Sequence, residues 1–317
     1  MKNEQKIYNF CGNRKLVASI AVIFVLLAVI GTLIMKVDVA IEFKGGTIIT
    51  YNYVGDINTK DVEKVISDTL NLNAKVGAGE NLSTGENNIT VEFTSKEGLS
   101  AERQNQLSNA LNEKFADNKL EILDSNDVNP TTGKEFFLKC LVAVLFAALL
   151  IIVYVALRFK KIGGWPAGVC SVIALFHDML VVYVAFIFCG FEINSNFMAV
   201  ILTILGYSIN NTIVIYDRIR ENKSLMPKAS LREITNAGCT QSLTRSVRTT
   251  VTTLGTMLIV SIVVFASGYT SLLSFSIPLI FGLISGAYSS LFVSTTVWVA
   301  WLEKAETKKK ANKSSKK

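Results

Sequence analysis

Polar side chains inside hydrocarbon-length segments are the first candidates for chemistry in this sequence. Residues 206–222, GYSINNTIVIYDRIREN, follow an apolar run and carry hydroxyl and amide groups at a depth where lipid offers no hydrogen-bond partner. Polar groups buried in membranes usually face a cavity or an ion path. Asn211 is therefore a candidate ion-relay residue, although polar residues that only join helices, at about 1 kcal/mol per contact, account equally well for the pattern.

A buried carboxylate is the second candidate. Asp178 stands beside the only histidine, His177, near the middle of the apolar segment 165–189. A carboxylate at that depth needs a partner or a water-filled site, so Asp178 joins the ion-relay candidates. The neighbouring pair also argues against a metal site, and no metal-ligand spacing occurs elsewhere in the sequence.

An arginine close to a short apolar run is the third candidate. The run 251–266 has only about 16 residues, whereas a membrane span needs roughly 20. Arg245 and Arg248 are therefore expected on the inner end of that helix, with Arg245 at a depth similar to that of Asn211. Snorkelling to phosphate headgroups is the alternative, and it suits Arg248 better than Arg245.

The composition is that of a polytopic helical membrane protein. Half of the residues are apolar, the mean hydropathy is +0.40, and several apolar runs reach about 20 residues. This excludes the class of soluble enzymes. The hydrophilic part shows no nucleophile with a base, no carboxylate pair and no phosphate-binding loop, and the five cysteines form no disulfide framework. We expect no enzymatic activity, no cofactor and no metal.

The charge is distributed unevenly and predicts the topology. The whole chain has a formal charge of +7, yet residues 36–135 are acidic by about seven charges. This asymmetry indicates opposite sides of a membrane, not a nucleic-acid surface, and places both termini in the cytoplasm of a cell-membrane protein. The predicted parts are a cytoplasmic N-terminus at 1–15, an uncleaved transmembrane helix at 16–35, an external domain at 36–135, transmembrane helices two to six at 136–301 with a basic cytoplasmic loop at about 218–248, and a lysine-rich cytoplasmic tail at 302–317.

The hydrophilic block predicts a small α+β domain between transmembrane helices one and two. Helices are expected to begin at the capping residues Asn58 and Ser100. Strands are expected at 40–53, 74–76, 89–93 and 120–123, with a loop at 77–87. The order β-α-β-β-α-β is that of a ferredoxin-like fold.

Two pairs of glycines have a predicted structural role. Gly45 and Gly46 interrupt the first strand, and we interpret them as the hinge of the external domain, with an ordinary turn as an equal alternative. Gly282 and Gly286 form a G-x-x-x-G pair in the last span, 273–301, where small residues let two helix backbones approach closely.

Six short motifs, in order along nearly the whole chain, make the sequence similar to the SecF family, the smaller subunits of the bacterial SecD–SecF complex. They are EFKGGT at 42–47, VNP at 128–130, HD at 177–178, the stretch at 206–222, QSLTRSVRTTVTT at 241–253 and GAYSS at 286–290. The resemblance implies half of an RND-type transporter whose other six spans come from SecD. It also implies that the pair uses the proton motive force, or sodium in some relatives, to promote late stages of protein translocation. Further implied partners are the SecYEG channel, SecA and the unfolded polypeptide in transit, with YajC and YidC as additional candidates and no nucleic acid.

Two positions depart from the family pattern. Glu42 replaces an aspartate and keeps the charge, whereas Asn211 stands where the family has an aspartate that pairs with the arginine matched by Arg245. Asparagine cannot titrate, although its carbonyl can coordinate a cation. The titrating group is then expected from SecD alone. Two alternatives stay open: a structural subunit that stabilises SecD and the translocase without conducting ions, and half of an RND-type small-molecule exporter, which the single modest external domain disfavours.

Overall fold

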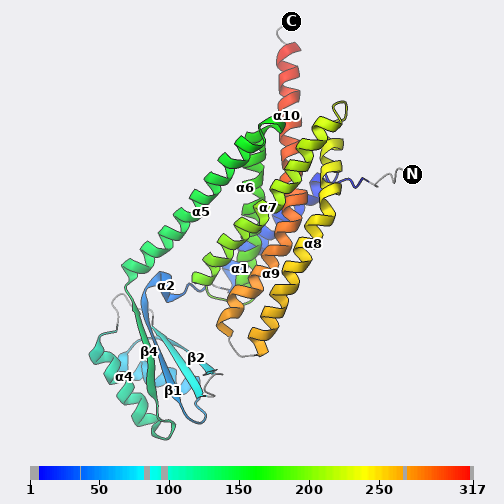
Figure 1. The fold of residues 1–317 in the computed structure, drawn as a ribbon. Helices are drawn as coiled ribbons and strands as arrows, with labels where there is room; N and C mark the ends of the chain where they lie inside the picture. Colours follow the sequence, from blue (N-terminus) through cyan, green and yellow to red (C-terminus); the bar gives the residue numbers. More distant parts are fainter. Residues whose placement is uncertain (1–6, 36, 82–85, 94–98, 267–269, 315–317) are drawn as a thin grey trace.

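The computed structural model describes residues 7–35, 37–81, 86–93, 99–266 and 270–314. A bundle of long helices forms one part of the molecule, and a small sheet with its helices extends from one end of that bundle (Figure 1). Within the described residues, six helical segments are long and apolar enough to cross a membrane. The prediction of a helical membrane protein with six spans is confirmed.

Two of the bundle helices begin at start signals that the sequence provides. The side chain of Asn129 accepts a hydrogen bond from the backbone N–H of Thr131, with Pro130 in the first turn of the helix. Asn194 caps the helix that begins at Ser195 in the same way, accepting from the backbone N–H of Phe197. The helices are α1 (Arg14–Met35), α5 (Pro130–Arg158), α6 (Gly164–Phe188), α7 (Ser195–Leu225), α8 (Leu231–Ala266) and α9 (Thr270–Tyr288), which continues through the π-helical turn η3 (Ser289–Ser294) into α10 (Thr295–Ser314).

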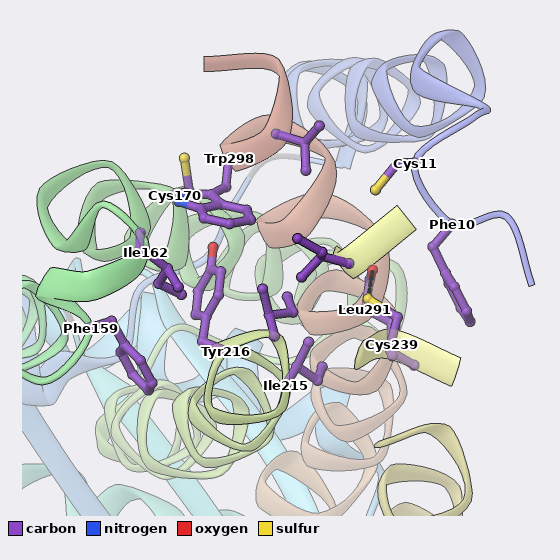
Figure 2. Packing of buried hydrophobic residues seen from close by; sticks show 14 of the residues in the cluster. Phe10, Cys11, Phe159, Ile162, Cys170, Ile215, Tyr216, Cys239, Leu291 and Trp298 are labelled. Carbon is purple, nitrogen blue, oxygen red and sulfur yellow. Dashed lines mark hydrogen bonds between the residues drawn. The ribbon is translucent and has the colours of Figure 1, made fainter. Parts of the chain in front are cut away.

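Helices α6 and α9 lie at the centre of the bundle. Helix α6 packs against α1, α5, α7 and α9, while α9 also packs against α7 and α8. At the end where α5 turns into α6, a cluster of buried apolar side chains fills the space between helices (Figure 2). Its aromatic rings are in contact: the Tyr216 ring lies 5.8 Å from that of Phe159 and 5.6 Å from that of Trp298, centre to centre. This cluster fixes α7 relative to α5 and α10.

The basic segment 218–248, for which the sequence predicts a loop, is almost entirely helical. Only 226–230 lie outside α7 and α8. Gln241 joins the two helices, because its side-chain oxygen accepts hydrogen bonds from Arg218, at 2.7 Å, and from Asn222, at 2.9 Å. The loop prediction was wrong, since hydropathy ends a span at its first charges although the helix continues beyond them. The second span likewise begins at Pro130, not at 136.

The domain between α1 and α5, called the external domain after its predicted location, is a four-stranded antiparallel sheet with two helices on one face. The strands are β1 (Gly46–Tyr53), β2 (Ala74–Asn81), β3 (Glu86–Phe93) and β4 (Glu121–Val128), in the order β2-β3-β1-β4. The helices are α3 (Thr59–Leu70) and α4 (Ala101–Lys114), followed by the short turn η1 (Ala116–Asn118). This order and the connections are those of the ferredoxin-like fold, as predicted.

Alternation along the two central strands builds the core of this domain. Ile49 and Tyr51 of β1 and Val91 and Phe93 of β3 are fully buried against Leu107 of α4. The intervening residues of these strands face the other side and are partly exposed. One face of the sheet is therefore apolar and covered, which defines the register of the two central strands.

The first strand begins later than its sequence pattern predicts. Residues 41–44 form a helical turn, α2 (Ile41–Lys44), and β1 begins at Gly46. The backbone turns at Gly45, with φ of 81°, and at Gly46, with φ of 148°, where a Cβ would lie 2.0 Å from the carbonyl oxygen of Phe93. Only glycine fits there, so the strand cannot extend back to residue 40.

The lengths of two other strands also differ from prediction. Strand β2 continues to Asn81 and β3 begins at Glu86, so most of the predicted loop 77–87 is paired backbone, while 82–85 lie outside the described residues. Strand β4 covers 121–128 instead of 120–123, with nearly all its residues exposed. Backbone hydrogen bonds extend these strands where the side chains give no apolar alternation.

Candidate functional site

A single carboxylate lies at the centre of the helix bundle, surrounded by hydroxyl groups. Asp178 of α6 is fully buried. Its oxygens accept hydrogen bonds from Ser208 of α7, at 2.7 Å, from Ser285 of α9, at 2.5 Å, and from Ser289 of η3, at 2.7 Å. Three donors from neighbouring helices converge on one acidic group, which is the arrangement that stabilises a buried charge.

Close packing of α9 against α7 makes this convergence possible. A Cβ added at Gly282 would lie 2.7 Å from the side chain of Ile204 and 2.8 Å from that of Val182, and one at Gly286 would lie 3.2 Å from Ser208. The predicted helix-packing glycines thus lie on the side of α9 that faces α6 and α7. The π-helical turn η3 follows directly, and such turns are frequent at functional sites because they reposition side chains.

Further hydroxyl groups continue from Asp178 along α7. Thr212 donates to Ser290 at 2.9 Å, and Ser290 donates to the backbone carbonyl of Ser208 at 3.2 Å. One turn farther, the hydroxyl groups of Tyr216 and Ser294 are 2.9 Å apart. Polar groups at intervals of four residues therefore line the contact between α7 and η3, from the carboxylate to the aromatic cluster of Figure 2.

The histidine beside the carboxylate is buried as well. The Nδ1 atom of His177 lies 3.5 Å from Asp178 and 3.3 Å from the hydroxyl of Ser285. The ring packs against Phe24 of α1 and Tyr288 of α9, with ring centres 5.6 and 5.9 Å apart. His177 thus connects the carboxylate with the contact between α1, α6 and α9.

The structure does not join Asn211 and Arg245 to each other. Asn211 is buried, and its amide nitrogen has no hydrogen-bond partner in the described chain. The hydrogen bond from Tyr207 to Thr250 and the contact of Ile219 with Gly238 fix α7 against α8, so that Asn211 lies level with the turn that carries Arg245. The Arg245 side chain is exposed and forms no ion pair with the described residues.

A second group of charges connects the external domain to the bundle. Lys75 of β2 forms ion pairs with Glu192, in the connection between α6 and α7, and with Asp38 at 3.4 Å. Lys44 also pairs with Asp38 at 3.1 Å. Partial burial raises the pKa of Asp38, but Lys44 and Lys75 outweigh this and hold it below its ordinary value. These ion pairs lie beside the predicted hinge, Gly45 and Gly46.

Sequence reasoning included the hydroxyl of Ser208 among its candidates but did not assign Ser285 or Ser289 to the site, although Ser289 lies in the motif GAYSS. Ser285 and Ser289 stand one turn apart on α9 and η3, as Ser208 and Thr212 do on α7. That spacing of four residues on a helix was a usable signal, because it places hydroxyl groups on one face. The glycine pair drew attention to the same face only as a packing motif.

The arrangement allows Asp178 to hold either a proton or a cation. Protonation would be balanced by the hydroxyl groups, which can reverse from donors to acceptors. A cation would meet the carboxylate and the free lone pairs of the same hydroxyl oxygens, which are ligands that hard cations prefer. In either case the net charge of the site changes, and it does so in the tightly packed contact between α6, α7 and α9.

Comparisons with known proteins agree on one family. Residues 107–304 match the family model described as protein export membrane protein SecD/SecF, C-terminal. The protein translocase subunit SecF of Alicyclobacillus acidocaldarius is 38% identical over 229 residues, covering 71% of each chain. The protein translocase subunit SecDF of Bacillus subtilis is 30% identical over 298 residues, which is 93% of this chain and 38% of that one.

A solved structure supports the same assignment. The crystal structure of SecDF from Thermus thermophilus superposes with a TM-score of 0.77 at 29% identity, over 96% of this chain. This chain spans about 40% of the length of that SecDF protein. The fold, the family model and the identity to SecF along most of the chain lead to one conclusion. The chain belongs to the SecF family of protein translocase subunits, which are multi-pass membrane proteins of protein export.

Proposed function

We propose that this chain pairs with SecD and uses the transmembrane ion gradient to promote late stages of protein translocation. The carrying observation is Asp178, a fully buried carboxylate that accepts hydrogen bonds from three serines on other segments. Burying a charge costs several kcal/mol, so a buried carboxylate whose nearest basic group is a histidine 3.5 Å away is retained where its change of charge is used. We assign Asp178 the role of the titrating or ion-binding group within this subunit.

We infer the partner SecD from the relatives and from polar groups on this chain that have no partner within the described residues. SecD and SecF form one chain in the SecDF proteins that this chain resembles over 38% to 40% of their length. Asn211 keeps an unpaired amide and Arg245 an unpaired guanidinium at the same depth of the bundle. An arginine within a membrane needs an anionic partner, and a carboxylate of SecD would supply one.

The location of the chain in the membrane and its further partners complete the proposal. The basic segment 218–248 and the lysine-rich tail support a topology in which both termini lie on the cytoplasmic side of the cell membrane and the acidic domain lies outside. There the domain would meet the unfolded polypeptide as it leaves the SecYEG channel after SecA has acted. YajC and YidC are further candidate partners, and we propose no enzymatic activity for the chain.

A structural subunit that conducts no ions is the second candidate function. Asn211 favours it, because an amide cannot exchange a proton where the family has an aspartate. In that case Asp178 would serve only to hold α6, α7 and α9 together.

Export kinetics distinguish the two functions. We expect Asp178→Asn to slow export at least tenfold in a pulse-chase assay, because the amide keeps the size of the carboxylate but cannot change its charge. Asp178→Glu should retain part of the activity and shift its dependence on external pH. The control is Asp217→Asn, which removes a carboxylate of α7 whose side chain is 47% exposed and pairs with Arg158 and Arg220. Normal export by Asp178→Asn, with SecD at normal levels, would support the structural subunit instead.

A further inference from the structure

One lysine at the edge of the sheet reaches the helix bundle. Lys75 of β2 forms ion pairs with Glu192, in the connection between α6 and α7, and with Asp38, in the connection between α1 and α2. The two connections are joined to each other, because the backbone N–H of Ile193 donates to the carbonyl oxygen of Asp38 at 2.9 Å. The N–H of Ala40 donates in turn to the carbonyl oxygen of Ile193 at 3.0 Å. Lys75 therefore holds the edge of the sheet to one joined backbone unit of the bundle.

A second attachment of the sheet to the bundle passes through α2. The side chain of Glu42 accepts a hydrogen bond from the backbone N–H of Ser195, the first residue of α7, at 2.8 Å, and α2 also packs against α5. The predicted hinge, Gly45 and Gly46, follows α2 directly. Strand β4 leaves the sheet at the same place, since Gly46 pairs with Val128. A rotation at this corner therefore moves the sheet, leaves α2 in place and separates β2 from the bundle.

Lys75 also has an acidic partner within its own sheet. In the antiparallel pairing of β2 with β3, Lys75 lies directly opposite Glu92. Residues opposite each other in such a pair have Cβ atoms about 5 Å apart, so their side chains are within reach of each other. In the structure the ammonium group instead contacts Glu192 and Asp38, and Glu92 lines a cavity of about 250 Å³ beside them. Two sets of acids therefore compete for one lysine.

The charges around Lys75 do not balance. The cluster holds three carboxylates and two ammonium groups, with one net negative charge when all are ionised: Asp38, Glu92, Glu192, Lys44 and Lys75. Burial and then the charges of Glu192 and Asp38 raise the pKa of Glu92, although the lysine opposite lowers it in part. Partial burial alone would raise the pKa of Asp38, but the two lysines hold it below its ordinary value. Protonation of Glu92 therefore removes the excess charge.

We propose that Lys75 is a proton-controlled latch that holds the external domain against the bundle. In the docked state Lys75 pairs with Glu192 and Asp38 beside a protonated Glu92. In the released state it pairs with the ionised Glu92 of its own sheet, and the domain turns at the hinge glycines. Docking brings two further acids close to Glu92, so the docked state binds this proton more tightly, and acidification through the raised pKa favours docking. The latch goes beyond the proposed coupling function, because it needs neither SecD nor ion transfer through the bundle.

Distance measurements on the full chain in complex with SecD test the latch. Spin labels are attached to cysteines introduced at Val54 of the domain and Leu272 of α9, which are 66% and 50% exposed, after the native cysteines have been replaced by alanine. Double electron–electron resonance in lipid nanodiscs then gives the ratio of docked to released domains, the docked distance being that of this structure. We expect this ratio to rise about threefold from pH 8 to pH 5. A ratio that does not change with pH, or that falls, would overturn the proposal.

Matched variants separate the latch from general effects of charge. Lys75→Met should lower the ratio about threefold at pH 5, and it leaves the core intact because this side chain is 60% exposed. Glu92→Gln, which resembles the protonated acid, should keep the domain docked at both pH values. The controls are Lys64→Met and Glu63→Gln at exposed positions of α3 in the same domain, and both should behave as the parent. A Lys75→Met protein as docked as the parent, or a Glu92→Gln protein that still responds to pH, would contradict the latch.

Discussion

The two cores of this molecule are built from opposite kinds of residue. The external domain buries large apolar side chains, such as Ile49, Phe93 and Leu107, between a sheet and two helices. The centre of the bundle buries Asp178 and a set of serine and threonine hydroxyls between closely packed helices. In water the burial of apolar surface drives folding, so the domain needs large apolar side chains in its core. Lipid is as apolar as leucine, so helices in a membrane are held by close packing and polar contacts.

Truncating a core residue of the external domain should have the largest effect on stability. We expect Leu107→Ala to lower the free energy of unfolding of this domain by about 2–5 kcal/mol, because a buried leucine leaves a cavity. Leu123→Ala, at a leucine that is 53% exposed on β4, should change it by less than about 0.5 kcal/mol. Pulse proteolysis of the full chain across a denaturant series measures both. Equal midpoints would show that α4 does not form the core described.

Enlarging a glycine in the bundle should have an intermediate effect. Gly282→Val would place atoms within 2.7 Å of Ile204, and we expect a loss of about 1–3 kcal/mol from overpacking. Gly255→Val makes the same change on α8, where a Cβ meets nothing within 4 Å. Thermal unfolding in detergent should separate the two variants by several degrees. A Gly255→Val protein as unstable as Gly282→Val would mean that helix propensity, not packing, is decisive.

A single carboxylate at the junction between the two cores should have the smallest effect. Burial raises the pKa of Glu92, and the nearby Glu192 raises it further, while Lys75 opposes them. The folded domain therefore binds this proton more tightly than the unfolded chain. Its stability should fall as pH rises from the ordinary value of 4.5 through the raised pKa.

Glu92→Gln tests that dependence. We expect the variant to be slightly more stable than the parent at pH 7, by less than about 1 kcal/mol, and to match it near pH 4, where Glu92 is protonated in both states. The measurement is the proteolysis midpoint at the two pH values. A parent protein more stable than the variant at pH 7 would show that the attraction of Lys75 for Glu92 outweighs burial and the repulsion from Glu192.

The sequence predicted the elements whose signals are local. Asn58 and Ser100 cap helices as expected, since each accepts a backbone hydrogen bond within three residues. Ile89, Val91 and Phe93 alternate and form a strand. Spans were recognised from apolar length, but their ends were not, because polar partners such as Gln241 extend α7 and α8 beyond the apolar run.

The candidate site was only half predictable. Asp178 was identified because a carboxylate in an apolar segment is costly in itself. Ser285 and Ser289 were not, because a serine in an apolar helix is inconspicuous until the fold brings it to an acid more than one hundred residues away. Asn211 and Arg245 lie level, as the sequence predicts, but their side chains do not pair with each other, which the sequence pattern could not reveal.

Both chain connections of the external domain leave it from the same corner. Strand β1 begins at Gly46 and pairs there with Val128, the last residue of β4, two residues before α5. Helix α2 in turn lies against α5, where a Cβ on Gly133 would come within 2.9 Å of the carbonyl oxygen of Glu42. The two chain segments that connect the domain to the bundle are thus adjacent, one through α2 and the other through α5. Because the sheet extends away from this corner, a tilt of α5 would move the far end of the sheet more than its attached end (Figure 1).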